Sequence, residues 1–173
     1  EDLFGVADLL SAQPALRKAL TDPAREGADR AALATRLLKG KVSAGALKVV
    51  DGLASSRWSD SRDLVDVLEQ LAVTSLLAAA EKADRLDAVE DELFRLGRVV
   101  AGNVDLRDAF SQRTPGAQRK ADLVGRLLSE KAAPETVRLA RQAAVAHRGR
   151  GTEGAIKSFV EAAARRRSAL IAE

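Results

Sequence analysis

The chain contains no cysteine, methionine or tyrosine, and His147 is its single histidine. Disulfides and thiolate metal ligands are therefore excluded, and one histidine cannot build a histidine-based metal cluster within the chain. We expect neither a metal nor another cofactor. Because a chain of 173 residues without methionine has no initiator of its own, we also expect an internal fragment of a longer protein.

Long apolar runs are missing as well. No run approaches the ~20 residues that a membrane-spanning helix needs, and the first residues lack the basic and apolar regions of a signal peptide. We therefore expect no direct membrane insertion of this fragment. Aromatic residues make up only 3% of the chain, which has 4 prolines and 12 glycines, whereas alanine, leucine and charged residues dominate. This composition favours helix over sheet, and we predict an all-α fold.

Positive charge is concentrated late in the chain. The net charge is +3, and residues 113–173 hold 13 basic residues against 6 acidic ones. Such an excess favours an acidic partner, and a solvated basic face is the alternative interpretation.

One stretch of the sequence occurs twice. Residues 3–20, "LFGVADLLSAQPALRKAL", are echoed at 93–110 by "LFRLGRVVAGNVDLRDAF", and "LATRLLKGK" is echoed, at the same offset of 90, by "LVGRLLSEK". This period is too long for a solenoid and suits a duplicated small domain. Chance similarity of leucine-rich helices is the alternative, and the common register across two different helices argues against it.

Periodicity and capping residues predict the helices of the second copy. We expect helices over 85–101, 105–110, 117–130 and 135–147, and a last helix from Thr152 to the chain end. Pro134 suits the first turn of the fourth of these. The third helix carries a leucine stripe on one face, formed by Leu123, Leu127 and Leu128.

A long helix is predicted from Ser61 through "RDLVDVLEQLAVTSLLAAAEKA", which contains no glycine or proline. One stripe at helical spacing is formed by Leu64, Leu68, Leu71, Ser75, Leu76 and Ala79, and further apolar residues lie on other faces, namely Val65, Val73, Leu77 and Ala80. We expect this helix to end one domain (1–68) and to begin the next (69–173). The prediction is two tandem six-helix-type bundles, the first lacking its first helix, joined by this shared helix. A single long helix in one core is the alternative.

None of the candidate catalytic motifs has the context that its chemistry needs. The segment "GRGTEG", 149–154, matches a dinucleotide-binding fingerprint, but a predicted helix precedes it where a strand is required. His147 has no serine, cysteine or acid in a triad pattern, and the basic run Arg165–Arg167 has no interleaved aromatic residues. We therefore expect no enzyme activity.

The second copy resembles the N-terminal domain of the delta subunit of the F-type ATP synthase, called OSCP in mitochondria. The family's "A-L-F-x-x-A" first helix is similar to "SLLAAAEKA", and its "N-x-x-L-R-x-F-L" segment is similar to "GNVDLRDAF". A paired-leucine helix, a proline-started helix and an "x-G-R" loop follow in the same order. Since an ordinary delta subunit has no duplication, the chain resembles most the form fused to the b subunit, which carries an extra delta-like copy.

The resemblance implies a six-helix bundle and a non-catalytic stator role in proton-driven ATP synthesis. The partners would be the α subunits of the catalytic head and the stalk helices of the b subunit, at the cytoplasmic face of the bacterial plasma membrane. In the family, the N-terminal helix of an α subunit lies in a groove between the first and fifth helices. Carried over, that groove would be lined by Val73, Leu76, Leu77, Ala80, Val137, Leu139, Ala140 and Ala144. A helical nucleic-acid binder that uses the basic stretch from Arg113 onward is the alternative function.

Overall fold

The computed structural model describes residues 2–111, 116–145 and 151–172. His147 and the start of the 149–154 motif lie outside this part. The described residues form ten α-helices and no strand, which confirms the all-α prediction. The helices are α1 (Asp2–Ala12), α2 (Pro14–Thr21), α3 (Gly27–Leu38), α4 (Ala44–Ser55), α5 (Ser61–Lys82), α6 (Leu86–Gly102), α7 (Val104–Ser111), α8 (Ala117–Leu128), α9 (Pro134–Val145) and α10 (Gly151–Ala172).

The contacts that residues make in space divide the chain into two compact units, Glu1–Ala72 and Val73–Glu173. The division falls inside α5, which gives its first part to unit 1 and its last part to unit 2. Of the predicted stripe, Leu64, Leu68 and Leu76 are buried and Leu71 is partly exposed, whereas Ser75 and Ala79 are exposed, so the stripe was drawn too wide. All four apolar residues expected on other faces are buried. Burial of more than one face of α5 is therefore confirmed.

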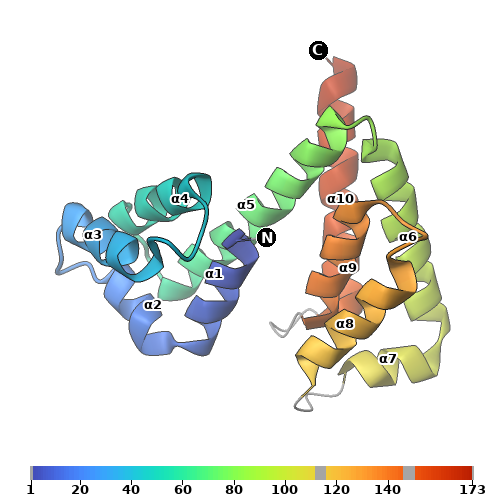
Figure 1. Ribbon diagram of the computed structural model, residues 1–173, viewed down its shortest axis with the longest axis horizontal. Coiled ribbons are helices and arrows are strands. Elements are labelled where there is room, and N and C mark those ends of the chain that lie inside the picture. The colour runs from blue at the N-terminus through green and yellow to red at the C-terminus, as the bar shows by residue number, and fades with distance from the viewer. Residues whose placement is uncertain (1, 112–115, 146–150, 173) are drawn as a thin grey trace. The chain divides into compact units, whose positions relative to one another are not determined.

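Unit 1 is built on the pair α3 and α4, which lie side by side, with α1 and α2 packed against them (Figure 1). Its core includes the fully buried Leu10, Val50 and Leu64. Gly27, the first residue of α3, comes so close to the end of α4 that a Cβ here would lie 2.6 Å from the carbonyl oxygen of Ser55. Only glycine fits this approach, because atoms at that distance overlap.

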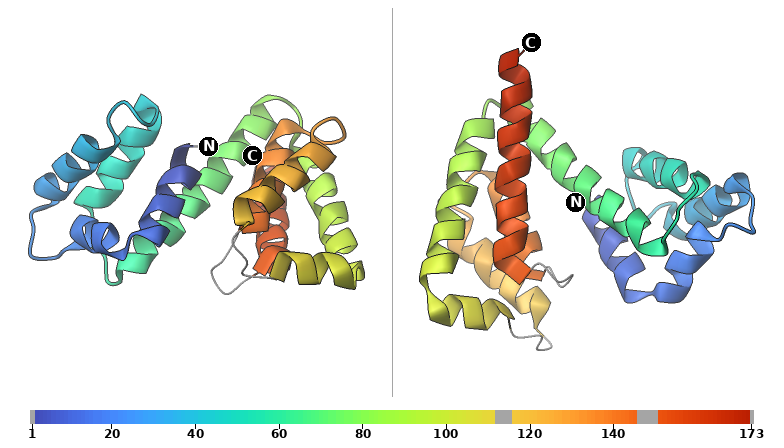
Figure 2. Two further views of the ribbon diagram at one scale, coloured as in Figure 1. Left: turned by 60° about the horizontal axis from the view of Figure 1, so that its bottom comes forward. Right: turned by 180° about the vertical axis from the view of Figure 1, so that it is seen from behind.

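In unit 2, α6 packs along α10 and α8 packs along α9, while α7 contacts α6 and α10 (Figures 1 and 2). Fully buried Val89, Leu93, Leu139 and Ile156 form its core. The start of α9 is tied to the residue before α6 by a two-pronged ion pair between Arg85 and Glu135. The Nη2–Oε1 and Nε–Oε2 distances of this pair are 2.7 and 3.2 Å.

The helix bounds repeat along the chain. Adding 90 to the bounds of α2, α3, α4 and α5 gives those of α7, α8, α9 and α10 at both ends, and α1 and α6 end at equivalent residues. Helix ends are ordinarily ambiguous by one or two residues. Five of these ends do not adjoin undescribed residues, namely the starts of α7, α8 and α9 and the ends of α6 and α8, and agreement there reflects the local sequence. The helices predicted between residues 85 and 145 are confirmed to within two residues, and α9 begins at Pro134 as expected; the end predicted at residue 147 lies outside the described residues.

Candidate functional site

The eight residues expected to line a partner groove are mostly interior side chains. Seven of them are buried, and only Val137 is partly exposed. Two of the seven, Ala140 and Ala144 on α9, pack with Val124 of α8, and Leu96 and Leu128 lie against this cluster.

Val137 faces the neighbouring helix α8. It lines a shallow depression with Asp122, Gly125, Arg126, Ser129 and Arg141. Arg141 donates a hydrogen bond to Asp122 at 2.8 Å across this depression, which places an ion pair beside the valine.

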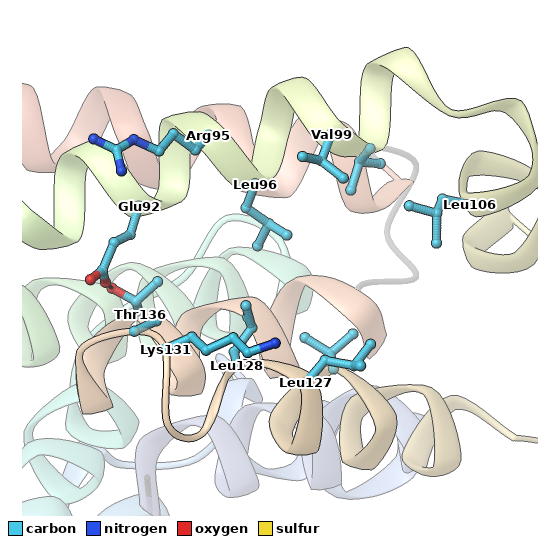
Figure 3. A pocket seen from close by; sticks show the side chains of 12 residues that line it. Glu92, Arg95, Leu96, Val99, Leu106, Leu127, Leu128, Lys131 and Thr136 are labelled. Carbon is cyan, nitrogen blue, oxygen red and sulfur yellow. Dashed lines mark hydrogen bonds between the residues drawn. The ribbon is translucent and has the colours of Figure 1, made fainter.

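An open apolar groove of about 370 Å³ lies elsewhere in unit 2, between α6 and α8 (Figure 3). One wall comes from α6 and α7 and the opposite wall from α8; the apolar lining residues are Leu96, Val99, Val100, Leu106, Val124, Leu127 and Leu128. None of the eight expected residues lines it. Ala140 and Ala144 instead belong to the layer beneath, because they pack against Leu96, Val124 and Leu128.

Large side chains on both walls are exposed. Val99 on α6 is 56% exposed and Leu127 on α8 is 58% exposed. The leucine stripe predicted for α8 therefore faces solvent at Leu127 and also at Leu123, which is 52% exposed and lies outside the groove. The α6 wall of the groove was not predicted from the sequence, although the neighbouring pair Val99 and Val100 could have indicated an exposed apolar residue. Adjacent residues of a helix point in different directions, so one of two neighbouring valines had to lie off the core-facing stripe.

One end of the groove is polar. A carboxylate oxygen of Glu92 on α6 accepts hydrogen bonds from the Ala133 backbone N–H at 2.9 Å and from the Thr136 hydroxyl at 2.6 Å (Figure 3). The carboxylate thus binds an N–H at the start of α9, where the first turn leaves donors unsatisfied.

Unit 1 has the same contact at equivalent positions, where Asp2 accepts a hydrogen bond from the Ser43 backbone N–H at 2.8 Å. Hydrogen bonding to Ser43 lowers the pKa of Asp2. Both units use an acidic side chain of one helix to bind the backbone at the start of another. We therefore assign Glu92 a structural role, which is to position the start of α9.

Two cationic side chains lie on the rim of the groove at this polar end. Arg95 on α6 has its side chain 78% exposed, and its ion pair with the equally open Asp91 spans 3.8 Å. Lys131, just beyond α8, is exposed as well. An exposed ion pair of this length contributes little energy. Arg95 and Lys131 lie at this end together with the carboxylates of Asp91 and Glu92, so the end carries charges of both signs.

Several basic side chains of unit 2 are engaged with acids within the unit. Arg166 pairs with Glu81, and Arg167 pairs with Glu90 at 3.1 Å. The hydrogen bond from Arg85 lowers the pKa of Glu135, which keeps that buried carboxylate charged.

Among the residues that the structure describes, no three or more histidine, aspartate or glutamate side chains lie close enough together to hold a metal ion. Within the same ranges, no helix combines the length and the apolar character needed to cross a bilayer. An open apolar groove, with charges of both signs at one end, lies on this helical bundle. Such grooves characterise proteins that bind amphipathic helices.

The comparison with protein families identifies the family of the chain. The model of the ATP synthase delta (OSCP) subunit matches residues 72–173, which is unit 2 plus one residue and more than half of the chain. The chain belongs to the ATP synthase delta (OSCP) subunit family.

Similar proteins extend the match through unit 1. The chain is 49% identical over 172 residues to an ATP synthase subunit delta from Kineococcus radiotolerans, covering 99% of this chain and 62% of that protein. It is also 49% identical to the protein of the same name from Salinispora arenicola, and 46% identical to that from Streptomyces griseus; each match covers 99% of this chain, and 63% and 64% of the respective relative. The chain thus spans somewhat less than two thirds of these relatives.

Proposed function

We propose that this chain is part of a non-catalytic peripheral-stalk subunit of an F-type ATP synthase. As a stator, it would hold the catalytic head still during proton-driven ATP synthesis, as a peripheral part of a complex at the cytoplasmic face of the bacterial plasma membrane. The family match over unit 2 carries this proposal. The relatives that align with 99% of the chain are named as subunits of the same enzyme, which supports it.

The proposed partner of unit 2 is the N-terminal helix of an α subunit, docked along α5 and α9. The apolar side chains of these helices named in the sequence analysis would form the supporting layer of that surface. Because seven of the eight are buried, their contribution would be to the shape of the surface. Val137, which is partly exposed, lies on the α8 side of α9. The stalk helices of the b subunit are the second proposed partner.

Unit 1 is proposed to be a second, delta-like copy. The common offset of 90 in the helix bounds supports a duplication, as do the equivalent acid-to-backbone contacts of Asp2 and Glu92. The proposal includes a b-type stalk segment fused ahead of unit 1. The reading frame upstream of Glu1 tests that part: a membrane-spanning helix followed by a long polar helix supports the fusion, and a start codon within a few residues refutes it.

Calorimetry with a peptide from the N-terminus of the α subunit of the same organism tests the partner. We expect saturable binding, weakened at least tenfold by Ala79→Asp on α5, beside Leu76 and Ala80, and changed less than twofold by Leu127→Asp. Both substitutions place a carboxylate at a position that already has some exposure, so circular dichroism should report the same helix content and melting temperature. The absence of any binding to the folded chain would refute the α-subunit proposal.

The nucleic-acid alternative gains no support from the structure, since Arg141, Arg166 and Arg167 are paired with acids of the same unit. A nucleic-acid binder releases counterions and so loses affinity steeply with salt. We expect no saturable binding to a 20-base-pair duplex at 50 mM salt.

A further inference from the structure

We propose that the C-terminal arm of α10, residues 164–170, is an ionic latch. Ion pairs hold the arm against α5 and α6, and it detaches when they break, while the rest of unit 2 stays folded. The arm and all of its ion-pair partners lie within unit 2. The latch needs no partner protein, so it stands apart from the proposed function.

The apolar packing of α10 ends before the arm begins. The buried apolar residues of this helix follow a helical spacing and fix its first part to the core: Ala155, Ile156, Phe159 and Ala163. None of residues 164–170 is buried, and Leu170 is 44% exposed. Figure 2 shows these last turns extending past the start of α6. Because helices in proteins are docked mainly by the burial of an apolar face, the arm must be held in another way.

Ion pairs provide the contact. Arg166 donates from Nε to a carboxylate oxygen of Glu81 near the end of α5, and the two side chains are 30% and 28% exposed. Nη2 of Arg167 lies 3.1 Å from Oε1 of Glu90, and Nη1 lies 3.9 Å from Oδ1 of Asp87. Both of these acids are on α6. Two adjacent arginines therefore bridge one turn of α10 to two other helices.

The environment of Glu90 makes its pair with Arg167 stronger than an ordinary surface pair. The Glu90 side chain is only 16% exposed, and its Oε2 is buried without a hydrogen bond among the described residues. Exposed ion pairs contribute little, whereas a partly buried carboxylate that loses its counter-ion leaves an uncompensated charge out of water. Release of Arg167 is therefore unfavourable, and the attached arm is the stable state at low salt.

The internal repeat shows that the fold also holds this turn by apolar burial. Helices α5 and α10 are both 22 residues long, and adding 90 to Leu76 and Leu77 of α5 gives Arg166 and Arg167. The two leucines are 5% and 1% exposed. Salt does not screen the burial of leucine, but at 1 M it reduces the range of charge interactions to about 3 Å. Sensitivity to salt is therefore expected of the arm of α10 and not of the equivalent turn of α5.

Hydrogen exchange of the whole chain tests the latch. Exchange of the amides in residues 164–170 is followed by mass spectrometry at 50 mM and at 1 M NaCl, and an unstructured peptide of the same sequence corrects for the effect of salt on the chemistry. We expect exchange in the arm to be at least fivefold faster at high salt. Exchange around the fully buried Leu139 of α9 should change less than twofold.

Neighbouring arginines provide matched variants. The double variant Arg166→Gln/Arg167→Gln should exchange at least fivefold faster in the arm at 50 mM NaCl and should lose its response to salt. The control is Arg165→Gln, since Arg165 is an exposed residue of the same turn. It removes the same charge close to the same helix end and so accounts for the helix dipole. Its exchange should differ less than twofold from that of the unmodified chain.

Reversing one pair gives an independent measurement. Arg166→Glu faces Glu81 with a like charge and should speed exchange in the arm, and adding Glu81→Arg should recover at least half of that change on a logarithmic scale. The salt series on the unmodified chain decides the question even if a variant does not fold. Exchange in the arm that is independent of salt would overturn the proposal, as would equal effects of Arg165→Gln and the double variant. Loss of protection in α9 together with the arm would show that α10 opens only with the whole unit, which also overturns it.

Discussion

Replacing Arg30 by methionine should destabilise unit 1 more than any other single change to a charged side chain in that unit. Arg30 is 4% exposed, and all five of its N–H donors are used. Nε donates to the carbonyl oxygen of Ala54 at 2.8 Å, and the remaining donors reach those of Asp22, Arg25, Ser55 and Ser56. The side chain therefore serves the ends of two helices, α2 and α4, whose last carbonyls have no partner within the helix.

The expected magnitude follows from these bonds. A hydrogen bond to a charged group contributes about 1.5–3 kcal/mol, but carbonyl groups near the surface recover part of this from water. The Ala54 carbonyl cannot, because that residue is fully buried, whereas Ser55 and Ser56 are exposed. We therefore expect a loss of about 3–4 kcal/mol in the free energy of unfolding, a large part of the ~4–11 kcal/mol typical of a domain of this size.

Urea denaturation followed by tryptophan fluorescence measures this loss. The single tryptophan, Trp58, lies in unit 1 and donates from Nε1 to the carbonyl oxygen of Leu53 at 2.8 Å, at the end of α4 that Arg30 also binds. With an m value of about 1–2 kcal/mol/M, a loss of about 3–4 kcal/mol should lower the midpoint by roughly 1.5–4 M. Arg36→Met is the control, because Arg36 lies exposed on the same helix; its midpoint should move by less than ~0.5 M. A shift for Arg30→Met no larger than that of the control would refute the reasoning.

Three further changes probe both units. Glu135→Gln should remove a pH dependence of the free energy of unfolding. The hydrogen bond from Arg85 is the main cause that lowers the pKa of Glu135. The stability that the carboxylate contributes is therefore present above pH ~4.5 and is lost as the pH falls through the lowered pKa. Denaturation midpoints of wild type and variant should therefore converge between about pH 6 and pH 3, and parallel curves would contradict the pair. Gly27→Ala should lower the urea midpoint read from tryptophan fluorescence, because its Cβ would lie 2.6 Å from the Ser55 carbonyl oxygen; an unchanged midpoint would show that α3 can shift. Leu93→Ala removes a fully buried side chain of unit 2 and should cost about 2–5 kcal/mol by circular dichroism, with a loss below ~1 kcal/mol contradicting the assigned core.

The helices were predictable because local residues determine them. Pro134 indicates where α9 begins, and the apolar spacing of residues in α6 indicates which face is buried. Of the five α6 residues at this spacing, Leu86, Val89, Leu93 and Val100 are buried and Leu96 is partly exposed. The repeat was visible for the same reason, since equivalent local sequences give helices with equivalent bounds.

The candidate site was less predictable, since periodicity identifies the apolar face of a helix without identifying what covers it. Leu127 on α8 and Leu37 on α3 occupy equivalent places in echoed sequences, yet one is 58% exposed and the other is partly buried. What covers such a face is set by tertiary contacts, and these cannot be predicted from the sequence of α8 itself. The structural role of Arg30 was not predicted for a related reason, because the five carbonyl oxygens that it binds belong to two segments outside its own helix.

The contrast between the units lies in packing rather than in composition. Leu127 on α8 and its counterpart Leu37 on α3 are the same residue type, and the acid-to-backbone contact at the start of α9 has a counterpart at the start of α4. Leu37 is nevertheless partly buried, whereas Leu127 is 58% exposed. Because the free energy gained by burial scales with the apolar area removed from water, Leu37→Ala should lower the free energy of unfolding more than Leu127→Ala does, and equal losses in urea denaturation would contradict this difference in packing.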